Sequence, residues 1–282
     1  MITVSTGAAT DAQVWLARGA LRSQRPRLVD LYGRLGEEEW SAPTRCPEWL
    51  VHDVVRHLCD VTVNWLRLLR GERPERVGME GFDPRTTPAA WVERSATRRP
   101  VETLADFGRA SADLLDEVER LVERRAPDRV PLPYGAVPWS IVVLHIFWDA
   151  WVHERDVVLP LGREHESSEI ESRAAAAFGL LISGVPFTLL GTPLDETVVL
   201  EGEGGGRFRL DVRDGTITVS VNGDEETGEA LRGRLPDVID SLIGRAPELG
   251  EVLHGPAERV QQLGMLGRFM RTPVAHPAGR SR

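Results

Sequence analysis

Apolar residues recur at helical spacing through the first half of the chain, in four segments that each present one apolar face. A repeat of three to four residues places such side chains along one side of a helix. Helices are therefore predicted over residues 11–35, 47–69, 101–125 and 139–159. Pro26 lacks a backbone donor and is expected to split or kink the first of them. Four long amphipathic helices predict a helical bundle.

The pattern changes after residue 162, where a polar and acidic stretch predicts a linker over residues 162–172. Beyond the linker, apolar and polar residues alternate over three short runs, as they do in half-buried strands, and helical spacing returns on either side. Asp214-Gly215 predicts a hairpin turn between the second run and the third. The strands are expected around residues 198–200, 208–212 and 217–221, and the helices at residues 172–190, 236–245 and 257–269.

The fold class predicted from this order is α+β, with two domains and a tail. Residues 1–162 would form the helical bundle and residues 173–270 a small α+β domain. Residues 271–282 are expected to be a disordered tail. Residues 71–100 are rich in Gly, Pro and charge, and a loop of that length is usually functional or mobile.

Composition and charge exclude several partners. The 282 residues carry a net charge of −9, whereas a protein that binds nucleic acid needs a basic surface. A membrane partner is not expected either, because basic runs are absent and the most apolar stretch, residues 141–152, is too short to span a bilayer. No secretion signal is apparent, and two cysteines suit a reducing compartment, so a cytoplasmic location is expected. Every basic residue is Arg, which suggests a GC-rich coding sequence.

Candidate chemistry lies on the fourth predicted helix. It is apolar on nearly every side and should be buried, yet His145, Asp149 and His153 recur on it every four residues and so share one face. A buried carboxylate needs a metal, an Arg or a set of donors to offset its burial. His57 lies on the inner stripe of the second helix and should point toward the same interior. Two imidazoles and one carboxylate are the usual protein ligands of an open catalytic metal site, although an Asp-x-x-x-His pair alone is common in proteins without metal.

Other polar residues allow simpler interpretations. His145 could be a ligand, a neighbour of the ligands or a residue above the site, and His52 and His165 are expected to face solvent. Cys59 should be turned away from His57 by its place on the helix. Cys46 could have a lowered thiol pKa at a helix start, but we interpret it as a small packed residue. The glycines at 202 and 204–206 join two predicted strands and predict a flexible hairpin loop rather than a phosphate-binding loop.

Three segments together resemble a known family. Residues 43–58, PTRCPEWLVHDVVRHL, resemble the start of the second helix in mycothiol-dependent maleylpyruvate isomerase-like proteins, which belong to the DinB-like four-helix metalloprotein superfamily. Residues 149–156, DAWVHERD, resemble the family's carboxylate-x-x-x-His motif, and residues 241–245, SLIGR, resemble its sterol-carrier-like domain. Two positions depart from the pattern: the carboxylate is commonly Glu where this chain has Asp149, and Gly is common where it has Glu48.

The resemblance implies a DinB-like bundle followed by a sterol-carrier-like domain, with a metal held by His57, Asp149 and His153. The metal, Zn in the first instance with Fe or Ni as alternatives, would bind the thiolate of mycothiol. The sulfur would add to a small electrophile and then leave, giving isomerisation, or stay, giving S-transfer. A GC-rich genome fits an actinobacterial source, where mycothiol is the usual small thiol.

Further roles are assigned on the same basis. His145 and Trp148 are predicted to bind the cofactor. Arg245 is predicted to face the cleft between the domains, as a catalytic residue that binds an anionic group of substrate or cofactor. The simpler interpretation of Arg245 is a cation at the carboxyl end of a helix.

Two other functions remain open. Two histidines and a carboxylate are also the facial triad of non-haem Fe(II) enzymes, and they can serve a metal-dependent hydrolase. The chain could instead be a non-catalytic small-molecule-binding protein with a structural metal, which a fourth ligand such as His145 would favour.

Overall fold

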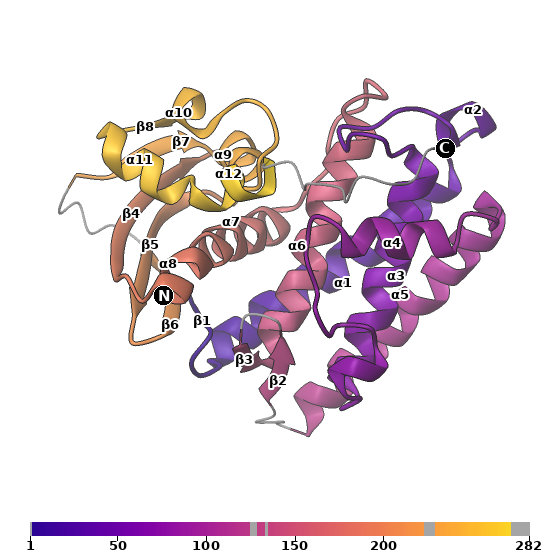
Figure 1. The fold of residues 1–282 in the computed structure, drawn as a ribbon, viewed down its shortest axis with the longest axis horizontal. Helices are drawn as coiled ribbons and strands as arrows, with labels where there is room; N and C mark the ends of the chain where they lie inside the picture. Colours follow the sequence, from indigo (N-terminus) through magenta and orange to yellow (C-terminus); the bar gives the residue numbers. More distant parts are fainter. Residues whose placement is uncertain (1, 125–128, 133–134, 223–228, 272–282) are drawn as a thin grey trace, which may run out of the picture.

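A computed structural model of the chain describes residues 2–124, 129–132, 135–222 and 229–271, and Figure 1 shows its elements in order. The predicted tail therefore lies outside the described residues, apart from Arg271. The helices are α1 (Asp11–Gly33), α2 (Glu37–Trp40), α3 (Val51–Leu69), the 3₁₀ helix η1 (Pro74–Arg76), α4 (Thr87–Arg94), α5 (Pro100–Glu123), α6 (Trp139–Val158), α7 (Glu169–Ser183), α8 (Val185–Leu190), α9 (Leu235–Leu242), α10 (Leu249–Val252), α11 (Ala257–Leu263) and α12 (Met265–Arg271). The strands are β1 (Ile2–Ser5), β2 (Arg129–Leu132), β3 (Gly135–Pro138), β4 (Leu194–Glu201), β5 (Gly206–Arg213), β6 (Thr216–Asn222), β7 (Leu231–Arg234) and β8 (Leu253–His254).

Helices α1, α3, α5 and α6 form a bundle in which α1 and α3 each pack against α5 and α6. Their apolar stripes face inward, so that residues such as Leu58, Leu114 and Phe147 are fully buried. Each such side chain contributes about 1.5–3 kcal/mol when it leaves water. The predicted N-terminal helical bundle is confirmed.

Helix α1 runs through Pro26 without a break, so the predicted split is wrong. Leu28 and Tyr32 lie beyond the proline and are fully buried in the bundle. Their burial offsets the single backbone hydrogen bond that Pro26 cannot make.

The long segment between α3 and α5 is more ordered than its composition predicts. It contains η1 and α4, and Trp91 and Val92 of α4 are buried. Helix α4 packs against α3, which closes that side of the bundle.

The second half is built on a six-stranded sheet with the order β1-β6-β5-β4-β7-β8. Neighbouring strands are antiparallel except β4 and β7, which are parallel. The predicted hairpin turn at Asp214-Gly215 joins β5 to β6. Strand β1 comes from the start of the chain and pairs with β6, with Ile2 opposite Val221. Residues 2–5 therefore belong to the sheet, although pattern alone assigns them to the bundle.

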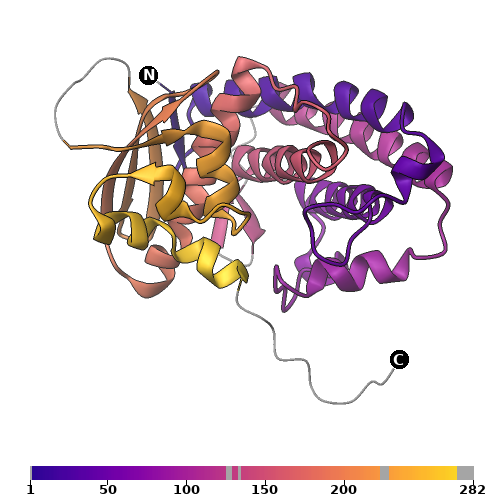
Figure 2. The same cartoon turned by 90° about the horizontal axis from the view of Figure 1, so that it is seen from above.

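Helix α7 lies between the bundle and the sheet and contacts α1 and α6 on one side and β1 and β6 on the other (Figure 2). Residues 169–190, which include α7 and α8, are long and apolar enough to cross a membrane by length and composition alone, but most of this segment is buried inside the protein. Ala174 to Ala177 and Phe178 are fully buried between the two halves. This segment is therefore the core helix that joins the two halves in one continuous apolar core.

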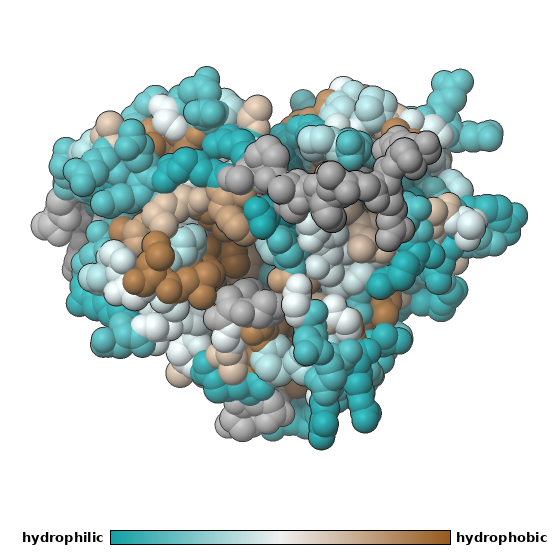
Figure 3. Space-filling model, viewed as in Figure 1, coloured by the Kyte–Doolittle hydropathy of each residue, from teal (hydrophilic) through white to brown (hydrophobic). Residues whose placement is uncertain are grey.

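The helix predicted over residues 172–190 is divided at Gly184 into α7 and α8. Leu189 and Leu190 of α8 expose 71% and 68% of their surface. Figure 3 shows apolar surface around a hollow on this face of the molecule, over the region of α8.

The predicted linker is packed rather than free. Trp151 Nε1 on α6 donates a hydrogen bond to Ser167 Oγ at 3.0 Å. The side chain of His165 is buried beside Glu154 and touches the Trp151 ring, so the prediction that His165 faces solvent is wrong. A polar residue can be buried here because α6 supplies both an acidic and an aromatic partner.

The β4–β5 hairpin loop yields a stability prediction, because Gly204 has φ +70° and a Cβ there would lie 2.5 Å from Glu169 O and 2.7 Å from Arg173 N. Gly204→Ala is expected to lower the free energy of unfolding by about 2–4 kcal/mol, through backbone strain and displacement of the start of α7. Urea denaturation measures the change. Gly250→Ala, where nothing lies within 4 Å, is the control and should stay within about 1 kcal/mol. Equal stability of the two variants would mean that this loop does not press on α7.

Candidate metal centre

Helix α6 is buried along its whole length, apart from two residues on one face. Every residue from Trp139 to Val158 is buried except His145 and Asp149, which are partly exposed. They lie one turn apart on the same face. The buried helix predicted from sequence therefore leaves one strip that solvent can reach, and the strip carries the polar side chains.

The side chains of His57, Asp149 and His153 meet in the bundle core. Their ligand atoms all lie within 4.8 Å of one another. His57 Nε2 is 3.4 Å from Asp149 Oδ2, and His153 Nε2 is 3.8 Å from Asp149 Oδ1. The two imidazole rings stand nearly edge to face, with centroids 4.8 Å apart. The sequence placed these three residues on facing helix stripes, and the fold brings them together.

The donor set fits a divalent metal ion. Bonds of about 2.0–2.1 Å to tetrahedral nitrogen and oxygen ligands imply donors about 3.4 Å apart, close to the spacings found here. Among the described residues, Asp149 Oδ2 and His57 Nδ1 are buried without a hydrogen-bond partner. A buried carboxylate oxygen without a partner is costly, and a cation would offset that cost.

The charges around the cluster keep Asp149 ionised. Burial acts to raise the pKa of the Asp149 carboxyl, but the imidazoles of His57 and His153 lower it well below its usual range. Burial lowers the pKa of His57, so that its imidazole is neutral at neutral pH. Arg25 is fully buried and adds a favourable charge interaction with Asp149. An ionised carboxylate and a neutral imidazole are the forms that ligate metals.

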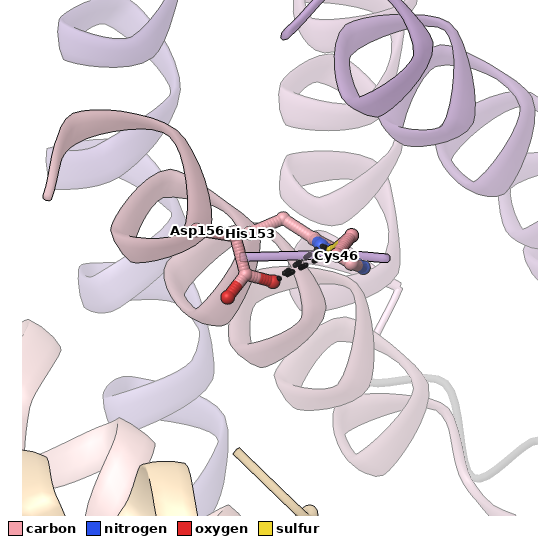
Figure 4. A group of neighbouring side chains, drawn as sticks. All are labelled: Cys46, His153 and Asp156. Atoms are coloured by element: carbon pink, nitrogen blue, oxygen red, sulfur yellow. Dashed lines mark hydrogen bonds and ion pairs between the residues drawn. The ribbon is translucent and has the colours of Figure 1, made fainter. Parts of the chain in front are cut away.

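A second group of side chains meets the other edge of the His153 ring, as Figure 4 shows. His153 Nδ1 lies 3.0 Å from Asp156 Oδ2 and 3.5 Å from Cys46 Sγ. The Cys46 thiol donates to Asp156 Oδ2 at 3.0 Å. Cys46 is packed in the apolar core, as interpreted from sequence, and its thiol in addition contacts the polar group around His153.

The loop before α3 carries Cys46 to this position. Helix α3 begins at Val51 rather than near Pro47, because the Asp53 side chain accepts from Leu50 N at 2.9 Å and caps the helix there. Residues 41–50 are left as a turn. Within it, Thr44 Oγ1 donates to Trp49 O and accepts from Cys46 N.

Glu48 in the same turn has a positive φ of 68°, which is the left-handed region. Gly adopts this conformation without steric cost. Glu48 adopts this conformation here although it carries a side chain.

Arg245 follows α9 and reaches across to the end of α6. Its Nε and Nη2 donate to Asp156 at 3.0 Å and 2.7 Å, and Nη2 donates to Cys46 Sγ at 3.4 Å. The acidic partner, Asp156, belongs to α6 and not to the last turn of α9. Arg245 is therefore more than a cation at the end of its own helix. Arg245 connects the second half to α6, and the anion it binds here is the protein's own carboxylate. Its catalytic role remains a prediction.

A second buried carboxylate extends the network. Asp240 accepts hydrogen bonds from Arg155 at 2.8 Å and from Arg45 at 2.7 Å. Arg45 also donates to Asp156 Oδ1 at 3.0 Å. Asp156 and Asp240 thus share three guanidinium groups from the bundle and from the second half.

His145 and Trp148 lie one turn before the ligand cluster, in an aromatic group. The His145 ring is 4.9 Å from Trp65, 5.3 Å from Phe178 and 6.5 Å from Trp148, between centroids. Burial lowers the pKa of His145 to about 4, which leaves it neutral. Its ligand atoms are not among those that gather within 4.8 Å of the other donors. Among the described residues, His145 therefore adds no fourth ligand to the cluster, and cofactor binding by His145 and Trp148 stays a prediction.

The remaining candidates lie elsewhere. His52 Nε2 is 2.9 Å from Thr103 Oγ1, so it is a partly buried link between α3 and α5 rather than a solvent-facing side chain. Cys59 is buried on the far side of α3, and burial raises the pKa of its thiol to about 12, which leaves it inert. It lies outside the groups of donors around His153.

Sequence reasoning missed Asp156, Cys46 and Arg45. Asp156 could have been found, because a residue three positions after His153 shares its helix face. Cys46 and Arg45 could not, because their places depend on the path of an irregular turn.

These features define a class of protein: a four-helix bundle that gathers two histidines and a carboxylate in its core and is joined to an α+β half. Residues 21–158 match the family described as the mycothiol maleylpyruvate isomerase N-terminal domain. Residues 21–158 therefore form a domain of that family.

Solved structures agree on the fold. The crystal structure of the mycothiol-dependent maleylpyruvate isomerase superposes with a TM-score of 0.53 at 15% identity, covering 86% of this chain and 93% of that one. A histidine-to-alanine mutant of the isomerase gives 0.52 with the same identity and coverage. The shared fold includes most of the second half as well as the bundle. No curated protein matches the sequence.

Proposed function

We propose that this protein is a cytoplasmic enzyme, a metal-dependent and mycothiol-dependent S-transferase or isomerase that acts on a small electrophile. The observation that carries the proposal is the convergence of His57, Asp149 and His153 donors within 4.8 Å, inside a domain of the mycothiol maleylpyruvate isomerase family. We propose Zn as the metal, with Fe or Ni as alternatives.

His57, Asp149 and His153 would hold the metal as three protein ligands, which leaves coordination positions open. When bound, the metal supplies a cationic centre that lowers the pKa of a coordinated thiol and fixes its sulfur as a nucleophile. The Asp149 side chain is 19% exposed, against 4% for His57 and 11% for His153. The small thiol is therefore proposed to approach from the Asp149 side.

The surrounding residues would exclude water and orient the reactants. Trp49 lies against both imidazoles, with ring centroids 5.1 Å from His57 and 6.1 Å from His153. His145 and Trp148 would form an apolar wall for the cofactor next to Asp149. Arg245, held at the junction of the two halves, is proposed to bind an anionic group of substrate or cofactor.

Thiol binding gives a direct test without knowledge of the electrophile. The protein loaded with Co²⁺ should develop a sulfur-to-cobalt charge-transfer band when mycothiol is added, because a thiolate is a natural ligand for the open position. The titration gives the affinity. Asp149→Asn loaded in the same way should lose the band or require much more thiol.

Trp15→Ala serves as the control for that titration, because this exposed residue on α1 lies outside the site and its replacement should leave the band unchanged. A Co²⁺ spectrum that stays the same at saturating mycothiol would refute thiol coordination and leave a metal protein of another kind.

A further inference from the structure

Asp156 is a fully buried carboxylate at the end of α6, one turn beyond His153. Its two oxygens accept hydrogen bonds from side chains of two other segments of the chain. Oδ1 accepts from Arg45 of the turn before α3 and from Arg245 of the second half. Oδ2 accepts from Arg245 and Cys46 and faces His153 Nδ1.

The contact between Asp156 and His153 determines which nitrogen of the imidazole ring carries the hydrogen and which one keeps its lone pair. A neutral imidazole carries one hydrogen, and the hydrogen bond made by one nitrogen determines the role of the other. An ionised carboxylate only accepts, so Asp156 holds the hydrogen on Nδ1. With a metal ion bound, the Nε2 lone pair of His153 would then be directed toward Asp149, where the other ligand atoms gather.

The carboxylate is itself held in one orientation. A guanidinium that donates through Nε and Nη2 to both oxygens fixes the plane of the carboxylate. Arg45 N also donates to Asp156 O at 3.1 Å, which ties the turn to the same point of α6. Because Arg245 belongs to the second half, the orientation of Asp156 depends on how that half packs against the bundle.

We propose that Asp156 is a positioning residue, which fixes the tautomer and direction of His153 and makes both depend on Arg245 of the second half. The proposal rests on the proposed function, because it takes His57, Asp149 and His153 as metal ligands. Its chemistry is that of a carboxylate-histidine-metal relay, in which loss of the outer partner typically weakens metal binding about 10- to 100-fold. The second half would thus influence the metal site without supplying a ligand.

The first test compares Zn²⁺ affinity by competition with a chromophoric chelator. Asp156→Asn is expected to weaken Zn²⁺ binding about 10- to 100-fold, because an amide has only one accepting oxygen and its NH₂ group can only donate. Asp240→Asn is the matched control. It removes the same charge from the same buried network, but Asp240 contacts Arg45 and Arg155 and not His153. Its affinity should stay within about threefold of wild type, since its effect on His153 is indirect.

Arg245→Met tests the link to the second half. It removes the clamp on Asp156 without touching a ligand, and it should weaken Zn²⁺ binding about three- to tenfold, less than Asp156→Asn does. Wild-type affinity in Arg245→Met would overturn the dependence on the second half. Equal losses in Asp156→Asn and Asp240→Asn would mean that the network acts by charge alone, and would overturn the positioning role.

A measurement on the unmodified protein guards against variants that fold poorly. In the Zn²⁺-loaded wild type with ¹⁵N-labelled histidines, long-range ¹H–¹⁵N correlations should show His153 protonated at Nδ1. A proton on Nε2 instead would overturn the proposal while leaving a metal site. Absence of Zn²⁺ binding in wild type would refute the proposed metal centre, and this inference would fail with it.

Discussion

Replacing His57, Asp149 or His153 with alanine is expected to cost the protein its bound metal. Each residue supplies one of three donors that lie within 4.8 Å of one another, and two remaining donors hold a divalent cation weakly. Affinity should fall by more than about a hundredfold, since even loss of an outer partner costs up to that much. Metal content after purification and dialysis, measured by atomic emission, should be stoichiometric in wild type and close to zero in each variant.

His145→Ala is the control for this comparison. It removes a histidine from the same face of α6, one turn earlier, from among aromatic rings rather than from the donor cluster. It should retain its metal. Full metal content in all three ligand variants would show that the site is elsewhere, and loss of metal in His145→Ala would favour a closed, structural site.

Turnover is expected to stop when the small thiol is omitted. A free thiol has a pKa of about 8.5, so only about 3% of it is thiolate at pH 7. A divalent cation held by His57, Asp149 and His153 would remove that limit and hold the sulfur beside the electrophile, which would add a proximity effect. Rates with mycothiol should exceed those without thiol by at least about a hundredfold. The assay compares mycothiol, other thiols and no thiol across conjugate acceptors and alkylating agents, with metal-free protein as the control.

Cys46 makes the thiol assay more demanding than the sequence suggested. Its sulfur lies beside His153 and Arg245, so the chain has a thiol of its own near the site. Cys46→Ser should remain thiol-dependent if the added thiol is the nucleophile. Metal-dependent turnover of the true substrate with no thiol, in wild type and in Cys46→Ser, would favour the oxygenase or hydrolase alternatives.

The sequence determined the parts of this protein that depend on local periodicity. Helical spacing of apolar residues located the four bundle helices, because burying one stripe of each helix is their main stabilisation. Strict alternation located β4, β5 and β6, since side chains of a strand point to opposite faces. The same reasoning placed His57, Asp149 and His153 on inward stripes, so the convergence of these three was predictable.

Tertiary packing decided the features that join distant segments. Pro26 lies within a helix because burial of Leu28 and Tyr32 beyond it outweighs one lost hydrogen bond. Strand β1 pairs with β6, which lies more than 200 residues away in sequence, and no local pattern reports a pairing over that distance. The side chain of His165 is buried because it packs against α6, although its neighbours in sequence are polar.

The residues that surround the candidate site were also decided by tertiary packing. The sequence supplied the three donors but gave no sign that Cys46, Arg45 and Arg245 meet at one carboxylate. These three residues come from an irregular turn and from the second half. No periodic spacing of apolar residues relates either segment to α6. Their meeting point is fixed only when the bundle and the sheet pack around α7, because the cost of burying Asp156 is offset by partners that folding alone brings to it.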